Sequence, residues 1–334
     1  MPNGNKSGAG RYNKKIYTLA GAAGILALVY VLTLFFDPAR VNARNAAFTW
    51  LSGEARDMAD RIEISRPGEE TLAMQRTNNK WFAILGGTQV PVKQGRIDDL
   101  FRILCTRGAF PRLGSSASSH GELGLSLENA SRLVIKGGAA ALPLLDLLVG
   151  DDDSAGREVY LRKNGENEYR SGDRLIKSYV SGAATAWYDL KLFAENRADA
   201  VQRIRVSPIK DGEGDEDFSF SRSENGWVWE GRIPTESQIP AESRIPVESI
   251  GEAADTYVRN IFDIQGDNFL SPEEGIEFNA GRLSIELGDG SVITILAAAE
   301  RDGMYPVTVS GNPYVYLLSR PAVTRLLRER ASLL

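Results

Sequence analysis

The chain has 334 residues, of which 43% are apolar and 25% charged, so it is long enough for two domains with real cores and wholesale disorder is excluded. Its formal net charge is −5, and four basic residues within the first fifteen leave −9 on the remainder, which disfavours nucleic acids and anionic lipid surfaces as partners. The single cysteine, Cys105, excludes an intrachain disulfide and a cysteine-based metal cluster.

The first predicted element is an apolar helix over residues 16–36. These 21 residues carry no charge, and at ~1.5 Å per residue they would span the ~30 Å hydrocarbon core of a bilayer. Basic residues crowd the N-terminal side, so we expect a cytoplasmic tail at 1–15, a single pass through the bacterial inner membrane, and a periplasmic body. The alternative is a cleaved signal peptide with a small-residue site at 41–43, although apolar regions of such peptides usually run about 7–15 residues.

The body contains an internal repeat. The run from Ala59 to Arg66, which leads to Trp81, returns as the run from Val201 to Ser207, which leads to Trp227. Each copy reads as a strand, a turn and a second strand that carries the tryptophan.

An amphipathic helix follows in each copy. Val90-Pro91-Val92 precedes apolar residues at helical spacing from Ile97 to Cys105, and Ile245-Pro246-Val247 precedes a similar stripe from Ile250 to Ile261. A capping-box pattern that begins at Ser249 marks the start of the second helix.

Further strands and a short helix close each copy. The run Arg132-Leu-Val-Ile135 matches Arg282-Leu-Ser-Ile285, and the closing helices are expected at 174–180 and 321–327. The order ββα-ββββ-α per copy predicts an α+β fold, with an N-terminal transmembrane helix followed by two tandem repeats of an antiparallel sheet with packed helices. The predicted parts are a tail (1–15), a transmembrane helix (16–36), a linker (37–58), a first repeat (59–193), a junction (194–199) and a second repeat (200–330).

The second copy contains three tandem hexapeptides with the core Ile-Pro-x-Glu-Ser, in a loop predicted at 232–249. Partners recognise extended segments punctuated by proline, so one interpretation is a docking strip. We favour a loop expanded by duplication, because three units are too few for a stacked β-helix.

This order of elements, with Gly124-Leu125 before Arg132 and a Trp187-Tyr-Asp-Leu190 closure, resembles the bacterial family named Domain of Unknown Function 4340. The resemblance covers residues 59–330 as two copies. Members of that family are commonly encoded beside ABC-type transport components of the gliding-motility kind. The resemblance therefore implies an accessory role, with an ABC-type permease or auxiliary transporter subunits as partners, and it supplies no catalytic residues.

Two residues invite a catalytic interpretation. His120 lies in the serine-rich run 115–121, but no Gly-x-Ser-x-Gly turn or orienting carboxylate accompanies it, so we expect a polar surface loop. Cys105 could be a nucleophile or a redox sensor, but it falls on the apolar stripe of its helix, where we expect a small core residue.

Two acidic runs, Asp151–Asp153 and Asp211–Asp217, could bind Ca²⁺. The EF-hand pattern fails in the second run, because Glu216 stands where the loop requires glycine. Both runs are expected at hairpin turns, where their carboxylates are solvated.

Trp81, Trp227 and Trp229 could line a ligand groove, but at strand positions they more often pack a sheet. The sequence therefore predicts no catalytic, cofactor-binding or metal-binding residues and no enzyme. We expect a non-catalytic, membrane-anchored accessory subunit of an ABC-type transport complex. The alternative is a periplasmic binding module that captures a small molecule or glycan in a cleft between the two repeats. An unrecognised hydrolase is the least favoured of the three hypotheses.

Overall fold

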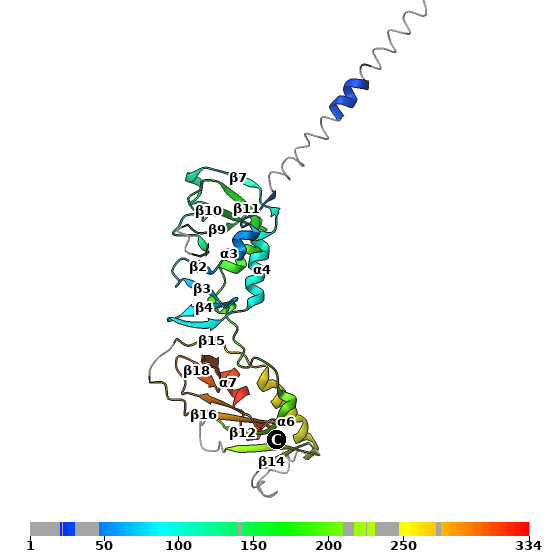
Figure 1. The fold of residues 1–334 in the computed structure, drawn as a ribbon, viewed down its shortest axis with the longest axis vertical. Coiled ribbons are helices and arrows are strands. Elements are labelled where there is room, and N and C mark those ends of the chain that lie inside the picture. Colours follow the sequence, from blue (N-terminus) through cyan, green and yellow to red (C-terminus); the bar gives the residue numbers. More distant parts are fainter. Residues whose placement is uncertain are drawn as a thin grey trace, which may run out of the picture. The chain divides into compact units, whose positions relative to one another are not determined.

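The computed structural model describes residues 21, 23–30, 47–138, 142–209, 217–224, 226–230, 247–271 and 275–333. Strands dominate this part of the chain (Figure 1), and they form sheets of two, nine and eight strands. The chain divides into two compact units. Unit 1 comprises residues 1–59, 64–70 and 100–181, and unit 2 comprises residues 60–63, 71–99 and 182–334.

The nine-stranded sheet has the order β5-β4-β3-β2-β8-β9-β10-β11-β7. Its strands are β2 (Arg61–Ser65), β3 (Leu72–Thr77), β4 (Lys80–Leu85), β5 (Thr88–Pro91), β7 (Arg112–Gly114), β8 (Ser131–Lys136), β9 (Leu145–Asp152), β10 (Glu158–Lys163) and β11 (Tyr169–Asp173). The two-stranded sheet pairs β1 (Ala47–Phe48) with β6 (Gly108–Ala109).

The eight-stranded sheet has the order β14-β13-β12-β16-β17-β18-β19-β15. Its strands are β12 (Val201–Ser207), β13 (Phe218–Ser223), β14 (Gly226–Glu230), β15 (Asn268–Phe269), β16 (Gly281–Leu287), β17 (Val292–Ala297), β18 (Met304–Val309) and β19 (Val315–Ser319). The order β4-β3-β2-β8-β9-β10-β11-β7 in the first sheet corresponds to the whole order of the second. The internal sequence repeat is thus also a repeat of strand order.

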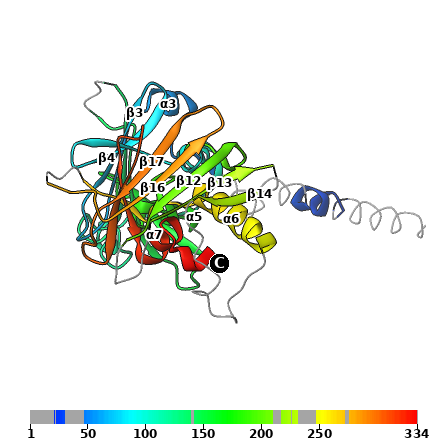
Figure 2. The same cartoon turned by 90° about the horizontal axis from the view of Figure 1, so that it is seen from below.

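The α-helices of the described part are short or of moderate length. They are α3 (Gly53–Met58), α4 (Gln94–Cys105), α5 (Leu175–Val180), α6 (Val247–Phe262) and α7 (Arg320–Leu326). In unit 2, α6 and α7 lie on one face of the eight-stranded sheet (Figure 2), and the hydroxyl of Tyr257 in α6 donates a 2.7 Å hydrogen bond to the carbonyl of Leu326 in α7.

The predicted fold class is wrong. Three antiparallel sheets, rather than a balanced α+β arrangement, account for most of the described chain, and helices are few. One physical reason is that the predicted turn between the first two strands of each copy hides a further strand, β3 in the first copy and β13 in the second. A tight turn then joins β3 to β4, and Asn78 (φ 50°) and Asn79 (φ 62°) adopt its left-handed conformation.

The predicted transmembrane helix at 16–36 is also contradicted. No helix in the part of the chain that the structure describes is long and apolar enough to cross a membrane. Of the predicted span, the structure describes only residue 21 and residues 23–30, which are helical. The predicted single pass, the inner-membrane location and the periplasmic placement of the body are corrected accordingly.

One predicted element lies almost wholly outside the described residues, and two others are confirmed. The hexapeptide loop at 232–249 lies outside the described residues except for its last three positions, which begin α6. The amphipathic stripes are confirmed, since Ile97, Leu100 and Leu104 in α4 are buried, as are Tyr257 and Ile261 in α6.

Asp146 on β9 anchors an ion pair on the sheet of unit 1. Arg132 on β8 donates two hydrogen bonds to its carboxylate, of 2.8 and 2.7 Å, and Asn164 donates a third of 2.9 Å. Burial by itself would raise the pKa of Asp146, but the hydrogen bonds from Arg132 and Asn164 outweigh it and lower that pKa.

Because the folded pKa of Asp146 lies below its unfolded value of about 3.9, the stability that it contributes is present above that value and is lost as the pH falls through the folded pKa. We therefore expect Asp146→Asn to lower the free energy of unfolding by about 1–3 kcal/mol at pH 7, and by progressively less below pH 4. Urea unfolding at a series of pH values measures the difference. A deficit that stays constant down to pH 2 would contradict this assignment.

Candidate functional site

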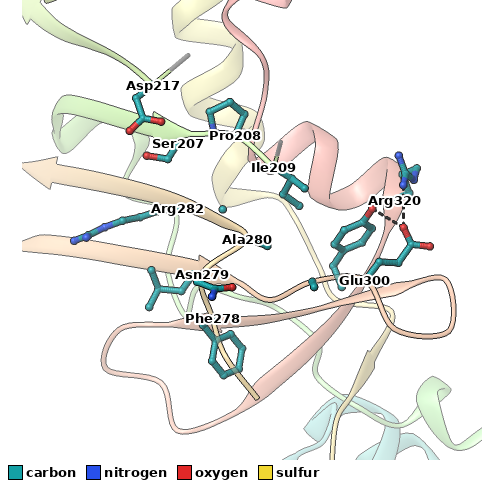
Figure 3. Close-up of a pocket in the computed structure, with 14 residues that line it drawn as sticks. Ser207, Pro208, Ile209, Asp217, Phe278, Asn279, Ala280, Arg282, Glu300 and Arg320 are labelled. Atoms are coloured by element: carbon teal, nitrogen blue, oxygen red, sulfur yellow. Dashed lines mark hydrogen bonds and ion pairs between the residues drawn. The ribbon is translucent and has the colours of Figure 1, made fainter. Parts of the chain in front are cut away.

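The clearest concave site in the described part of unit 2 lies where β12 and β16 meet the turn after β17 (Figure 3). We call it the Arg282 hollow. It has a larger chamber of about 840 Å³ and a smaller one of about 380 Å³, and both are lined by Ser207, Asp217 and Arg282.

Local structure brings these residues together. Ser207 ends β12, Asp217 directly precedes β13, and Arg282 is the second residue of β16. Gly281 allows the side chains of Leu327 and Ile209 to pack closely against the start of β16. A Cβ at this position would lie 2.6 Å from Cδ1 of Leu327 and 3.0 Å from Cγ1 of Ile209. Ser207, Asp217 and Arg282 are thereby held at one end of the hollow, and Glu300 and Arg320 lie at the other (Figure 3).

At that other end, three side chains satisfy one another. The hydroxyl of Tyr305 donates a 2.6 Å hydrogen bond to Glu300, and Arg320 donates a second of 2.9 Å to the same oxygen. The hydrogen bonds from Tyr305 and Arg320 lower the pKa of Glu300, so its carboxylate stays ionised at neutral pH. The ionised Glu300 carboxylate is held in place by these two hydrogen bonds. It is therefore poorly suited to act as a general acid, which must give up a proton.

The sheet face that bears the smaller chamber carries polar side chains in cross-strand rows. In the central row Arg203 stands opposite Glu286 and bonds it at 2.7 Å, and it also bonds Glu230 of the neighbouring row at 2.7 Å. These two carboxylates raise the pKa of Arg203. In the next row Arg205 stands opposite Ser219 on β13 and Ser284 on β16.

Arg205 and Arg282 differ from Arg203 in having no carboxylate partner among the residues that the structure describes. Arg282 makes one weak hydrogen bond of 3.3 Å from Nε to the hydroxyl of Ser284. Both arginines are exposed, and both line the smaller chamber. Two guanidinium groups therefore line the smaller chamber together with serine hydroxyls. Each guanidinium has five N–H donors, and most of these have no acceptor among the described residues.

The Arg282 hollow does not include His120 or Cys105, the two candidates for catalysis, which belong to unit 1. The serine-rich run 115–121 is mostly exposed, as a surface loop predicts, but His120 itself is buried, with 9% of its surface exposed. Its Nε2 lies 3.0 Å from the carbonyl of Asn167 and its ring meets Tyr169 edge-on. Cys105 is half-buried at the end of α4, rather than in the core, and burial raises the pKa of its thiol, which disfavours the reactive thiolate.

The acidic runs are only partly described. Asp152 ends β9, where it pairs with Arg174 and Lys177, each at 3.3 Å, and Asp153 accepts backbone hydrogen bonds from Arg157 and Glu158 in the turn to β10. Of the run Asp211–Asp217, only Asp217 lies within the described residues. Among the described residues, no group of three or more acidic, histidine or cysteine side chains is placed to hold a metal ion.

The tryptophans lie in packed positions. Trp81 and Trp227 are buried, and the indole of Trp227 donates a 2.7 Å hydrogen bond to Asp255 on α6. Trp229 meets Phe218 and Phe220 at centroid distances of 5.5 and 5.7 Å. The rings of Trp227 and Trp229 contribute to the core of the eight-stranded sheet, and Trp81 is buried on the nine-stranded sheet, as their strand positions predicted.

Apart from Asp217, which ends the second acidic run, the residues of the Arg282 hollow were not among the sequence candidates. A signal was available, because Arg203, Arg205 and Ser207 alternate with apolar residues in β12, and Arg282, Ser284 and Glu286 do so in β16. Such alternation predicts a polar sheet face, but only the register of the strands shows which polar residues become neighbours.

Comparisons of this chain with family models, with curated proteins and with solved structures found no match. The resemblance to Domain of Unknown Function 4340 therefore stays a prediction from sequence pattern. Function has to be argued from the site itself.

Proposed function

We propose that this chain is a non-catalytic binding protein that takes a small polar solute or glycan into the Arg282 hollow. The observation that carries the proposal is the contrast between the two ends of the hollow. Glu300 is bound by Arg320 at one end, whereas at the other end no carboxylate of the described residues is paired with Arg205 or Arg282. A concave space with a few convergent polar groups is the usual form of a small-ligand site.

Three features support binding without chemistry. The carboxylate of Glu300 is held ionised by two donors, Tyr305 and Arg320, which both bond its Oε2. The side chains that line the hollow include no histidine or cysteine. His120 bonds a backbone carbonyl in unit 1, and the raised pKa of Cys105 disfavours nucleophilic attack.

The resemblance to Domain of Unknown Function 4340 suggests which complex such a binding protein would belong to. It implies that the chain serves as an accessory subunit of an ABC-type transport complex, and a binding protein is a natural component of such a complex. The bound solute would then be a transported compound or a signal that regulates the permease.

A second candidate is direct binding of a partner protein, such as an ABC-type permease subunit. The observation that favours it is an exposed row across the polar sheet face, in which Val228 and Val292, 46% and 55% exposed, flank the Arg203 ion-pair cluster. Apolar side chains around paired charges are a common composition of protein interfaces.

Thermal unfolding of the full chain with a panel of neutral and charged sugars, hydroxy acids and amino acids tests the first candidate. A solute that binds the folded state at about 100 times its Kd raises stability by about 2.7 kcal/mol, which shifts the Tm measurably. We expect at least one member of the panel to raise the Tm of the natural chain and not that of Arg282→Gln. A Tm that no solute moves, together with stoichiometric co-elution with permease subunits, would overturn the first candidate in favour of the second.

A further inference from the structure

We infer that the ligand of the Arg282 hollow is a small hydroxylated monoanion, such as an acidic sugar or a hydroxy acid, whose carboxylate is bound by Arg205 and Arg282. This inference rests on the proposed function, because it assigns a chemical class to the ligand of the same hollow. It follows from the register of β12 and β16 and from a comparison of the two repeats.

The register places the two arginines side by side. Arg205 on β12 stands opposite Ser284 on β16, and Ser207 stands opposite Arg282, so the two arginines are diagonal neighbours on one sheet face. Diagonal neighbours in an antiparallel pair lie about 7–8 Å apart at the backbone, within reach of two long side chains that converge on one group. Guanidinium groups bind carboxylates with two parallel hydrogen bonds, which gives both affinity and orientation.

In the first repeat, the arginine that corresponds to Arg282 is bound by a carboxylate of the same sheet. Arg132 corresponds to Arg282, since the register pairs Arg132 with Leu148 and Arg282 with Leu296. Two residues along, Val134 faces Asp146 in the first repeat, whereas Ser284 faces Thr294 in the second. Asp146 holds Arg132 through two hydrogen bonds, and the second repeat has a neutral threonine at that position.

A second charge changes in the same direction. In the alignment of the runs that begin the two repeats, Glu63 on β2 corresponds to Arg205 on β12. The second repeat thus has a cation where the first has a carboxylate, and it lacks the acid that pairs with the arginine of the next strand. Among the described residues, these two differences remove the carboxylates nearest to Arg282 and place a second guanidinium group beside it. The opposite change on the same strand, from Lys136 to Glu286, does not offset them, because Glu286 is already paired with Arg203 at 2.7 Å. An external carboxylate can therefore take the place that Asp146 has beside Arg132.

The remaining carboxylates limit the charge of the ligand. Glu230 and Asp217 line the smaller chamber, but Glu230 is already paired with Arg203 at 2.7 Å. Asp217, exposed at the rim, offers an acceptor for a ligand hydroxyl and repels a second negative charge. The hydroxyls of Ser207, Ser219 and Ser284 add further hydrogen-bonding groups, so hydroxylated monoanions are favoured over phosphate-like dianions.

Calorimetric titration of the full chain with glucuronate, glucose and inorganic phosphate, at constant ionic strength, tests the inference. We expect glucuronate to bind at least about tenfold more tightly than either of the other two. Thr294→Asp would restore the acid of the first repeat and is expected to weaken glucuronate binding at least about tenfold, whereas the near-isosteric Thr294→Asn keeps it. Arg205→Gln is expected to lose binding, and Arg259→Gln, an equal charge change on α6, is not.

The outcomes separate the two proposals. If glucose binds as tightly as glucuronate, and Thr294→Asp has no effect, the monoanion inference fails while the binding function stands. Tighter binding of phosphate than of glucuronate likewise overturns the inference alone. If none of a full panel of neutral and charged solutes binds, the proposed function itself fails. Urea unfolding of Thr294→Asp and Thr294→Asn ensures that loss of binding is compared between equally folded chains.

Discussion

Replacing Tyr257 by alanine is expected to lower the free energy of unfolding by about 4 kcal/mol, a typical cost for removing a fully buried aromatic side chain. Tyr257 has no exposed surface, and its ring packs 6.2 Å from that of Phe220 on β13. Its hydroxyl also joins α6 to α7 through the carbonyl of Leu326. Burial raises the pKa of Tyr257 far above its usual range, so the hydroxyl is protonated and can donate this hydrogen bond at neutral pH.

Tyr257→Phe serves as the matched control. It keeps the ring and removes only the hydroxyl, which leaves the buried carbonyl of Leu326 without this donor, so we expect a cost of about 1–2 kcal/mol. Urea unfolding of both variants measures the contribution of the ring and that of the hydroxyl to the free energy of unfolding. Equal losses for Tyr257→Ala and Tyr257→Phe would mean that the hydroxyl, rather than the packing of the ring, accounts for the contribution of Tyr257.

Replacing Gly150 by alanine is expected to lower the free energy of unfolding of unit 1 by about 2–3 kcal/mol. Gly150 lies on β9, and a Cβ there would overlap the backbone oxygen of Leu123. That oxygen also accepts a 3.0 Å hydrogen bond from the amide of Asp151, so it cannot move away without breaking the contact between this loop and the strand.

Gly53→Ala, in the same unit, makes the identical chemical change in open space. Gly53 is in α3, and a Cβ there meets no atom within 4 Å. Alanine favours a helix over glycine by about 0.5–1 kcal/mol, so this variant is expected to be slightly more stable. If urea unfolding shows equal effects for Gly150→Ala and Gly53→Ala, the close approach of Leu123 to β9 is not what requires glycine at position 150.

The local elements of this fold could be predicted from sequence where periodicity was strong. The helical spacing from Ile97 to Leu104 predicts α4, and its apolar residues are buried. The interpretation was wrong where a strand had little apolar alternation. In β3 only Leu72 and Met74 are buried, and the polar half of the strand was indistinguishable from a turn.

The fold class and the membrane span were wrong for different reasons. Weak strands such as β3 were missed, so the balance of helix and sheet was misjudged. The span at 16–36 was inferred from its length, its lack of charge and the basic residues that precede it, and most of it lies outside the described residues. In the described part of the chain no helix is long and apolar enough to cross a membrane.

The candidate site could not have been located from sequence, although its residues were visible there. Arg205 and Arg282 lie 77 positions apart, and only the pairing of β12 with β16 makes them neighbours. The search for chemistry in the sequence was directed at histidine, cysteine and acidic runs. A site made of arginines and serines on a sheet face has no local motif that such a search would detect.

The two repeats differ in their charges at corresponding positions. In unit 1 the pair Arg132–Asp146 is closed by three hydrogen bonds on the carboxylate and contributes to stability. In unit 2 the corresponding Arg282 is held only weakly, by Ser284. We interpret this difference as a structural pair in one copy and a binding position in the other.

A crystal structure of the full chain with glucuronate would show directly whether the hollow binds a carboxylate. We expect the ligand to occupy the Arg282 hollow, with its carboxylate bonded to Arg205 and Arg282 and a hydroxyl directed at Asp217. Glucuronate bound at any other place, or a hollow that stays empty at a concentration at which calorimetry shows saturation, would contradict it.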